Sequence, residues 1–275
     1  MKRRLIVTGI VLTAGVIVAF FIRFGSTRDQ DSMLLSGNVE VTEVNVGFKV
    51  PGKVQDLYTD EGKAVLQGEK MAILERAELE SMVDQGRASV RNAQAQFEKS
   101  QKDFERYAIL YRDGVIASQQ MDAAKTAYDV AVSQLQLSRA ALRTADVRLQ
   151  DAVLYSPLNG IVLKKNVEAG ETIGSGVVLF TIGDLENPWV KVYVKEDKMG
   201  RVKLGQRAEV RVDSFPLKQY EGTVTYISSE AEFTPKNVQT KEERVKLVFG
   251  VKVSVKNQNN ELKPGMPADV KIFLK

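Results

Sequence analysis

Cys and His, the residues that most often supply a nucleophile or a general base, are absent from this sequence. None of the 275 residues is a Cys or a His, so thiol chemistry, thiolate metal sites and imidazole bases are excluded. The adjacent carboxylates Glu242 and Glu243 lie in a polar stretch where solvated charge is the ordinary interpretation, and the sequence has no phosphate-binding glycine loop. We therefore predict no catalytic residues, no cofactor, no metal site and no enzymatic activity.

Charge and composition narrow the possible partners. The net charge is +4, with 44% hydrophobic and 27% charged residues, which are ordinary values for a folded protein. So small a net charge does not favour a polyanionic partner. The basic residues after position 190 are spread along alternating patterns rather than gathered in one run, so we predict no nucleic-acid partner.

Residues 1–28 are predicted to form an N-terminal transmembrane anchor and linker. Lys2, Arg3 and Arg4 precede an apolar run over residues 5–22, which would give about 27 Å of helix, enough for a bilayer core. The basic N-terminus favours an orientation with the rest of the chain outside the cytoplasm. A cleaved signal peptide is the alternative, although Phe20–Arg23 is a poor cleavage sequence.

Residues 76–153 carry a regular pattern that predicts a long antiparallel helical hairpin. In each half, seam positions recur at alternating steps of three and four residues, which is the 3.5-residue period of a left-handed coiled coil. Bulky and small residues alternate along both seams, which lets two helices approach closely. The first seam is Leu79, Val83, Gly86, Val90, Ala93, Phe97, Ser100, Phe104, Tyr107 and Tyr111, and the second is Met121, Ala124, Tyr128, Ala131, Leu135, Ser138, Leu142, Ala145, Leu149 and Ala152.

The segment 112–118 separates the two predicted helices. We expect Gly114 to adopt a left-handed conformation after the first helix and Ser118 to cap the second. A connection this short forces the helices to run antiparallel. The hairpin is therefore expected to have its tip at residues 114–118.

Two short β-rich segments flank the hairpin and repeat one another. Residues 29–75 contain a first barrel strand and a first half-motif, and this half-motif aligns with residues 154–183 at an offset of 108. Each segment has too few strands to bury a core alone, so we predict that they pack together as one β-sandwich. Their matched turn glycines are Gly52, Gly62 and Gly68 in the first half, and Gly160, Gly170 and Gly176 in the second.

Residues 184–275 alternate apolar and polar side chains, as strands with one buried face do. Several strands of this kind in sequence predict an antiparallel β-barrel or sandwich. The expected inward positions are Val190, Val192, Val194, Ala208, Val210, Val212, Val245, Leu247, Phe249, Val251, Val253, Val255, Val270, Ile272 and Leu274.

Together these segments resemble the HlyD-type membrane fusion proteins. Residues 50–54 and 61–65 are similar to the first half of the family's split biotinyl/lipoyl-like motif, and residues 155–162 and 168–171 to the second. Residues 263–270 are similar to the segment that enters the last barrel strand. The resemblance implies a mainly β fold with a long inserted coiled-coil hairpin, an N-terminal membrane anchor, a lipoyl-like β-sandwich and an antiparallel β-barrel.

The resemblance also implies a function and partners. Such proteins are periplasmic adaptors that link an inner-membrane exporter, either ATP-driven or proton-driven, to a TolC-type outer-membrane channel for efflux or secretion. The implied location is the inner membrane with a single anchor at residues 5–22 and the bulk of the chain in the periplasm. Self-association, as a hexamer, is also implied.

Two alternatives are an envelope scaffold that transports nothing and a true biotin or lipoyl carrier. The carrier is disfavoured because the hairpin replaces the turn that would bear its modified Lys.

In this family the hairpin tip contacts the channel through an Arg, a Leu four residues later and a Ser seven residues after that. Arg106 and Leu110 match, but Ala117 stands at the third position and Ser118 follows one residue late. An ordinary ion pair between Arg106 and Asp103 is the competing interpretation. The channel-contact residues implied by the resemblance are Arg106, Leu110, Gly114, Val115, Ile116, Ala117 and Ser118.

Overall fold

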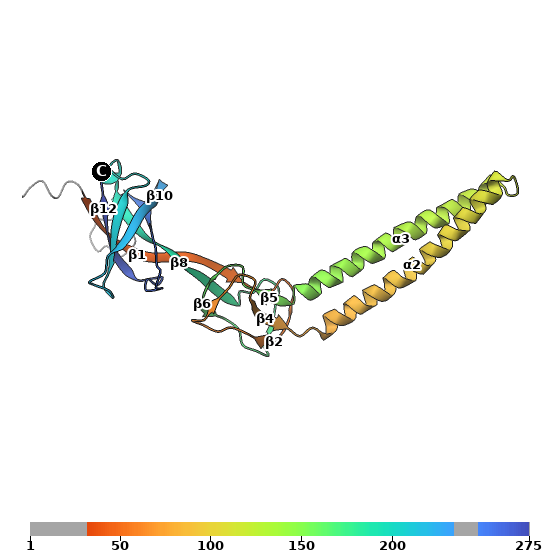
Figure 1. Cartoon of the computed structure of the whole chain (residues 1–275), viewed down its shortest axis with the longest axis horizontal. Helices are drawn as coiled ribbons and strands as arrows, with labels where there is room; N and C mark the ends of the chain where they lie inside the picture. The colour runs from red at the N-terminus through yellow and green to blue at the C-terminus, as the bar shows by residue number, and fades with distance from the viewer. Residues whose placement is uncertain (1–31, 234–246, 275) are drawn as a thin grey trace, which may run out of the picture. The chain divides into compact units, whose positions relative to one another are not determined.

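A computed structural model describes residues 32–233 and 247–274 (Figure 1). The expected anchor at residues 1–28 lies outside this part of the chain. No helix within residues 32–233 or 247–274 is long and apolar enough to cross a membrane. The chain divides into two compact units, one of residues up to Thr42 and from Asp184 onward, the other of Glu43–Gly183.

The first unit is a ring of six strands. Its strand order is β1-β12-β9-β10-β11-β8, and a further pairing of β1 with β8 closes the ring. The five pairings from β1 round to β8 are antiparallel. The members are β1 (Ser32–Val46), β8 (Phe180–Lys195), β9 (Arg207–Val212), β10 (Tyr220–Phe233), β11 (Leu247–Val255) and β12 (Pro267–Phe273), with the short helix α4 (Glu196–Met199) after β8.

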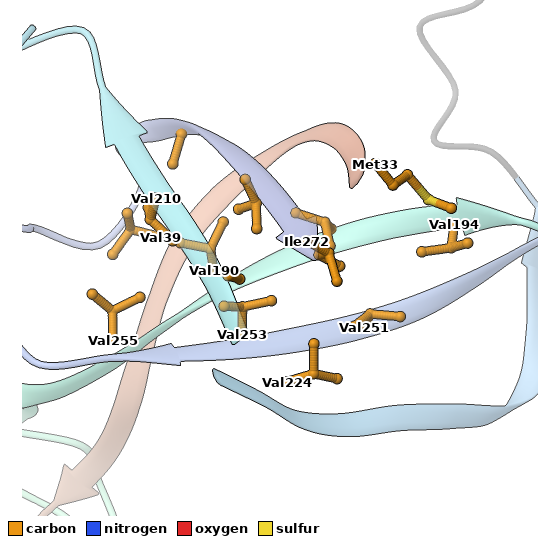
Figure 2. Packing of buried hydrophobic residues seen from close by; sticks show 14 of the residues in the cluster. Met33, Val39, Val190, Val194, Val210, Val224, Val251, Val253, Val255 and Ile272 are labelled. Carbon is orange, nitrogen blue, oxygen red and sulfur yellow. The ribbon is translucent and has the colours of Figure 1, made fainter. Parts of the chain in front are cut away.

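The interior of the ring is filled by the alternating apolar positions. Val190, Val210, Val253 and Val270 are fully buried. Figure 2 shows side chains from different strands, among them Met33 and Val190, directed into a common interior. The predicted period-two pattern is therefore confirmed for β8, β9 and β12.

The predicted burial was wrong at the start of β11. Leu247 is 37% exposed and Phe249 is only half-buried, whereas Val248 is buried. β11 keeps one register with β8, in which Phe249 pairs with the buried Val194, so the strand does not reverse its faces. Its pairing with β10 is interrupted between Ile227 and Ala231, and the alternation of burial is lost at this end of the strand.

The second unit contains a small β-sandwich and the helical hairpin. One layer has the strand order β5-β4-β2-β7, and in the other β3 pairs with β6 and β6 with β8. The elements are β2 (Gly52–Leu57), β3 (Ala64–Val65), β4 (Lys70–Leu74), α2 (Ala77–Arg112), α3 (Ser118–Gln150), β5 (Val153–Tyr155), β6 (Gly160–Lys165) and β7 (Thr172–Ile173).

The register of the sandwich follows the repeat found in the sequence. Gly52 pairs with Ile173 in the same way that Gly160 pairs with Val65, and the offset of 108 relates the two pairs. The amide of Val54 donates to the carbonyl of Glu171 at 2.8 Å, and the equivalent bond runs from Val162 to Lys63 at 3.0 Å. Strands of the first half therefore pair with strands of the second half, in two equivalent places.

The six repeat glycines divide into two roles. Gly62, Gly68, Gly170 and Gly176 have φ values of 78°, 79°, 93° and 78°, which favour glycine because a Cβ is strained there. Gly52 and Gly160 instead begin strands β2 and β6. A Cβ on Gly160 would lie 2.5 Å from the Gly183 carbonyl oxygen, so close backbone approach explains this glycine.

Strand β1 carries the valines that precede the first half-motif. It is one strand of 15 residues. The strand runs without a turn, although its buried side changes between Val41 and Val44, where Thr42 and Glu43 are both exposed. It pairs with β12 from Ser32 to Asn38. This strand supplies the barrel strand that the sequence had placed before the first half-motif.

Candidate functional site

The hairpin positions the tip, and its seam is the one the sequence predicted. Figure 1 shows α2 and α3 side by side and joined by a short loop. Val83, Ala93, Ala131 and Leu135 are buried, and the other predicted seam positions are buried or half-buried except Tyr111, which is 47% exposed. Tyr111 lies within two residues of the helix end at Arg112, where the partner helix no longer covers it.

Aromatic stacking stiffens the half of the hairpin nearer the tip. Tyr128 on α3 lies between two rings of α2, with its centroid 5.8 Å from that of Phe97 and 5.3 Å from that of Phe104. Such pairs stabilise by about 0.5–1.5 kcal/mol beyond their burial. The tip is therefore carried on an ordered shaft rather than on a frayed helix end.

The base of the hairpin is bound to the sandwich within the same unit. The amide of Leu74 on β4 donates to the carbonyl of Ala152 at 3.0 Å, which joins the strand before α2 to the residue after α3. Lys49 lies 3.5 Å from the Asp151 carboxylate. Both ends of the hairpin are therefore fixed, as an insertion between two half-motifs requires.

Gly114 ends helix α2 with the hydrogen-bond pattern of a Schellman motif. Its φ is +71°, its amide donates to the Tyr111 carbonyl at 3.0 Å, and the Val115 amide donates to the Leu110 carbonyl at 2.9 Å. These bonds satisfy carbonyls that have no partner at a helix end. They also fix Val115, which is 67% exposed, at the outermost turn.

The expected cap of the second helix was wrong. Ala117, with φ −77° and ψ 152°, occupies the N-cap position, and no side chain caps the helix. Ser118 is the first helical residue and is exposed. The helix begins one residue earlier than a cap at Ser118 would require. The Ser118 hydroxyl therefore lies inside the first turn and does not cap the helix.

The charged residues near the tip pair with one another. The Arg106 guanidinium lies 3.6 Å from the carboxylate of Asp103, one turn earlier, so the ion pair that was the competing interpretation is present. The Arg106 side chain is nevertheless 68% exposed. Arg112 lies 3.6 Å from Asp113. Local pairing leaves the apolar surface of Val115, with the half-buried Leu110 and Ile116, as the distinctive chemistry of the tip.

A groove on the hairpin below the tip was not found by sequence reasoning. It has a volume of about 320 Å³ and lies where small residues on α3 face long polar residues on α2. The alternation of small and bulky seam residues was the available signal, but the pattern alone does not tell which side of the seam stays open. The lining includes Gln96, Lys99, Asp103, Tyr107, Ala123 and Ala127.

Within the described residues, no three His, Cys, Asp or Glu side chains are grouped so that they could hold a metal ion. The geometry of the tip offers shape, apolar contact and hydrogen bonding.

Comparison with known proteins assigns the family. A family model described as a CzcB-like, barrel-sandwich hybrid domain matches residues 42–184, slightly more than half of the chain. A second, described as a CusB-like, beta-barrel domain, matches residues 188–273. The chain belongs to the membrane fusion proteins, the periplasmic adaptor family. The boundaries of the two matches lie close to those of the two compact units.

Relatives of this membrane fusion protein extend over its whole length. A UPF0194 membrane protein of Acidithiobacillus ferridurans is 30% identical, over 99% of this chain and 96% of its own. A UPF0194 membrane protein of Yersinia enterocolitica is 29% identical, over 95% and 97% of the two chains.

Solved structures share the fold of this membrane fusion protein. The membrane fusion protein Spr0693 of Streptococcus pneumoniae superposes with a TM-score of 0.69 at 20% identity, over 88% of this chain and 99% of its own. A chimera of MacA carrying the Pseudomonas aeruginosa MexA α-hairpin gives 0.63 at 24% identity, over 89% and 81%. An inserted α-hairpin is therefore shared with structures of this fold.

Proposed function

We propose that this membrane fusion protein links an inner-membrane exporter to a TolC-type outer-membrane channel for efflux or secretion. The observation that carries the proposal is the exposed Val115, held by the Gly114 motif at the end of a paired helix of 36 residues. A helix of that length reaches about 54 Å. An apolar residue fixed so far from the sandwich is suited to contact a partner.

The tip would dock by apolar contact supported by hydrogen bonds. Val115, Ile116 and Leu110 supply the apolar surface, and the exposed guanidinium of Arg106 can exchange its contact with Asp103 for a carbonyl or carboxylate of the channel. Ala117 and Ser118 lie exposed beside them. The Ala at the usual Ser position removes one hydroxyl from this surface and leaves the apolar contact in place.

The remaining parts have separate roles in the proposed assembly. Residues 5–22 anchor the chain in the inner membrane, and the strand ring meets the transporter, whose ATP hydrolysis or proton flow supplies the energy. Copies of the protein assemble side by side as a hexameric tube, with the hairpins forming its wall. The protein itself acts mechanically, by sealing and coupling the conduit.

Site-specific photo-crosslinking in living cells tests the channel contact. A photoreactive amino acid at Val115 should capture an outer-membrane channel protein, identified by mass spectrometry. The matched control is Val130 on the shaft of α3, which is exposed to a similar degree, 63% against 67%. Val130 should yield adducts with other copies of this protein and none with the channel.

A substitution separates an adaptor from a scaffold. Val115→Asp should abolish export while the helical content stays unchanged, because the side chain is exposed and has no role in the seam. Undiminished export by this variant, together with adducts only between copies from position 115, would favour an envelope scaffold that transports nothing.

A further inference from the structure

One end of the strand ring gathers several apolar residues on its outer face. Along β1, the outward positions Ser36 and Asn38 are polar and exposed, whereas the outward Leu34 is apolar and 70% exposed. On the neighbouring strand β12, Leu34 pairs with Lys271, and Ser32 pairs with the half-buried Phe273. Each of these two residue pairs therefore places one apolar side chain, Leu34 or Phe273, beside a polar one.

A loop between α4 and β9 extends this apolar edge. Leu204 in that loop is 65% exposed, and with Leu274 it lines a pocket of about 400 Å³. Ile272 pairs with Ala208, so the end of β12 and the loop before β9 lie at the same end of the ring. Leu34, Leu204, Phe273 and Leu274 thus belong to one edge, here named the apolar edge.

Basic side chains surround the apolar edge. Lys271 places its ammonium 5.6 Å from the centre of the Phe273 ring, an arrangement in which the stem covers apolar surface and the charge stays in water. Exposed leucines beside a half-buried phenylalanine and lysines are a composition that suits binding to a membrane interface. Among the described residues, the exposed charged side chains at this end are Lys195, Lys198, Arg201, Lys203, Arg207 and Lys271 against Glu196, Asp197, Glu221 and Glu230.

The chain itself limits how far this edge can lie from a bilayer. The apolar run ends at Ile22, and β1 begins at Ser32. Ten residues span about 35 Å at most. β1 starts at the apolar edge, so an anchor at residues 5–22 keeps this end of the ring within that distance of the membrane.

We propose that the apolar edge rests on the bilayer surface, with Leu34 and Leu204 inserted at the level of the lipid head groups and the surrounding lysines bound to anionic lipid. This inference rests on the proposed anchor but not on the proposed channel. The contact holds the ring at a fixed distance from the membrane, because the edge and the anchor bind the same surface at two points.

Fluorescence quenching in lipid nanodiscs tests this contact on the full chain. The natural sequence has no Cys, so Leu34→Cys and Leu204→Cys each accept one environment-sensitive dye. The control is Leu217→Cys, which is 98% exposed and lies between β9 and β10 at the opposite end of the ring. Discs of phosphatidylethanolamine and phosphatidylglycerol carry a nitroxide on the lipid head group.

We expect dyes at positions 34 and 204 to lose fluorescence and the dye at 217 to keep it. Replacing phosphatidylglycerol by neutral phosphatidylcholine should weaken the loss, because the lysines then lack a counter-charge. Equal fluorescence at all three positions overturns the contact while leaving the channel proposal untouched. Failure of the chain to remain with the discs overturns the contact and the anchor together. If the dyes at 34 and 204 were quenched and Val115 gave no adduct with a channel, the bilayer contact would stand and the proposed channel contact would be rejected.

Discussion

Lys165 Nζ lies 3.3 Å from Asp60 Oδ1, so a side chain of the second half-motif binds the first across the sandwich. The same ammonium lies 2.8 Å from Glu168, and the Lys165 side chain is only 17% exposed. The two carboxylates are related by the repeat, but their shared lysine is not, because its counterpart is Leu57. A single lysine therefore joins two halves whose backbones are otherwise nearly symmetric.

Removing this lysine should weaken the sandwich and change its response to acid. The amide of Glu61 and then Lys165 hold the pKa of Asp60 below its usual value of 3.8. The stabilisation is complete above pH 3.8 and is lost as the pH falls through the lower folded-state pKa. In Lys165→Met, the melting temperature at pH 7 should be lower and its decline below pH 3.8 smaller. The control is Lys164→Met, which replaces the neighbouring exposed lysine. If the melting temperatures of both variants declined equally below pH 3.8, the contact between Lys165 and Asp60 would not be the cause.

Leu135 should be essential to the hairpin. It is 5% exposed in the seam, so Leu135→Asp buries a charge without a partner and should cost about 4 kcal/mol or more. The helical signal in circular dichroism should fall, and melting should begin at a lower temperature. Leu137→Asp, at a position 64% exposed on the same helix, should change neither measurement. An unchanged helical signal in Leu135→Asp would refute the seam.

These seam residues show why the hairpin could be predicted from the sequence, as could the left-handed Gly114, while the cap of the second helix could not. A period of 3.5 residues over ten positions fixes which face of each helix is buried, and Tyr111, at the last turn, was the exception. The cap depends on one residue of loop length. Ala117 and Ser118 were both compatible with the pattern, and only the backbone conformation distinguishes them.

The same distinction holds for the strands. The offset of 108 predicted the pairing of Gly52 and Gly160 with the opposite halves, because matched sequences form matched pairings. The exposure of Leu247 at the start of β11 could not be predicted, because β10 pairs irregularly with this end of the strand between Ile227 and Ala231. The alternation of residues within β11 carries no information on an irregularity in β10. The stacking of the Tyr128 ring with Phe97 and Phe104 could not be predicted either, because the period of the seam does not determine the orientation of the rings.

Ala117→Ser should stabilise the second helix of the hairpin. The N-cap position lacks a side-chain acceptor, and a serine hydroxyl there can accept a hydrogen bond from an unpaired amide of the first turn, for a gain of about 1 kcal/mol. Urea unfolding should show a higher midpoint with an unchanged slope. Ser118→Ala should have almost no effect, because Ser118 is already inside the helix. A loss of stability in Ser118→Ala would restore Ser118 as the cap.

Gly114 should resist substitution for conformational rather than steric reasons. Its φ is +71°, and a Cβ placed on it meets no atom within 4 Å. Gly114→Val should therefore cost about 1–2 kcal/mol through backbone strain alone, measured as a fall in the free energy of unfolding. Gly114→Asn should cost less, since Asn tolerates the left-handed region. Equal losses for Val and Asn would indicate a steric origin and contradict this account.

Tyr220 should make the strand ring sensitive to alkali. Burial, followed by a 2.8 Å hydrogen bond to the Glu261 carboxylate, raises the pKa of Tyr220 from 10.0 to about 12. Its stabilisation is complete below pH 10 and is lost as the pH rises from 10 towards 12, because the unfolded chain ionises first.

Tyr220→Phe should reduce the free energy of unfolding by about 1 kcal/mol at pH 7 through the lost hydrogen bond. Between pH 9 and 11 the free energy of unfolding of this variant should fall less than that of the wild type. Tyr226→Phe, which removes an exposed tyrosine of the same strand, should keep the wild-type decline. If the decline in Tyr220→Phe matched that of Tyr226→Phe, the alkaline loss would belong to other groups.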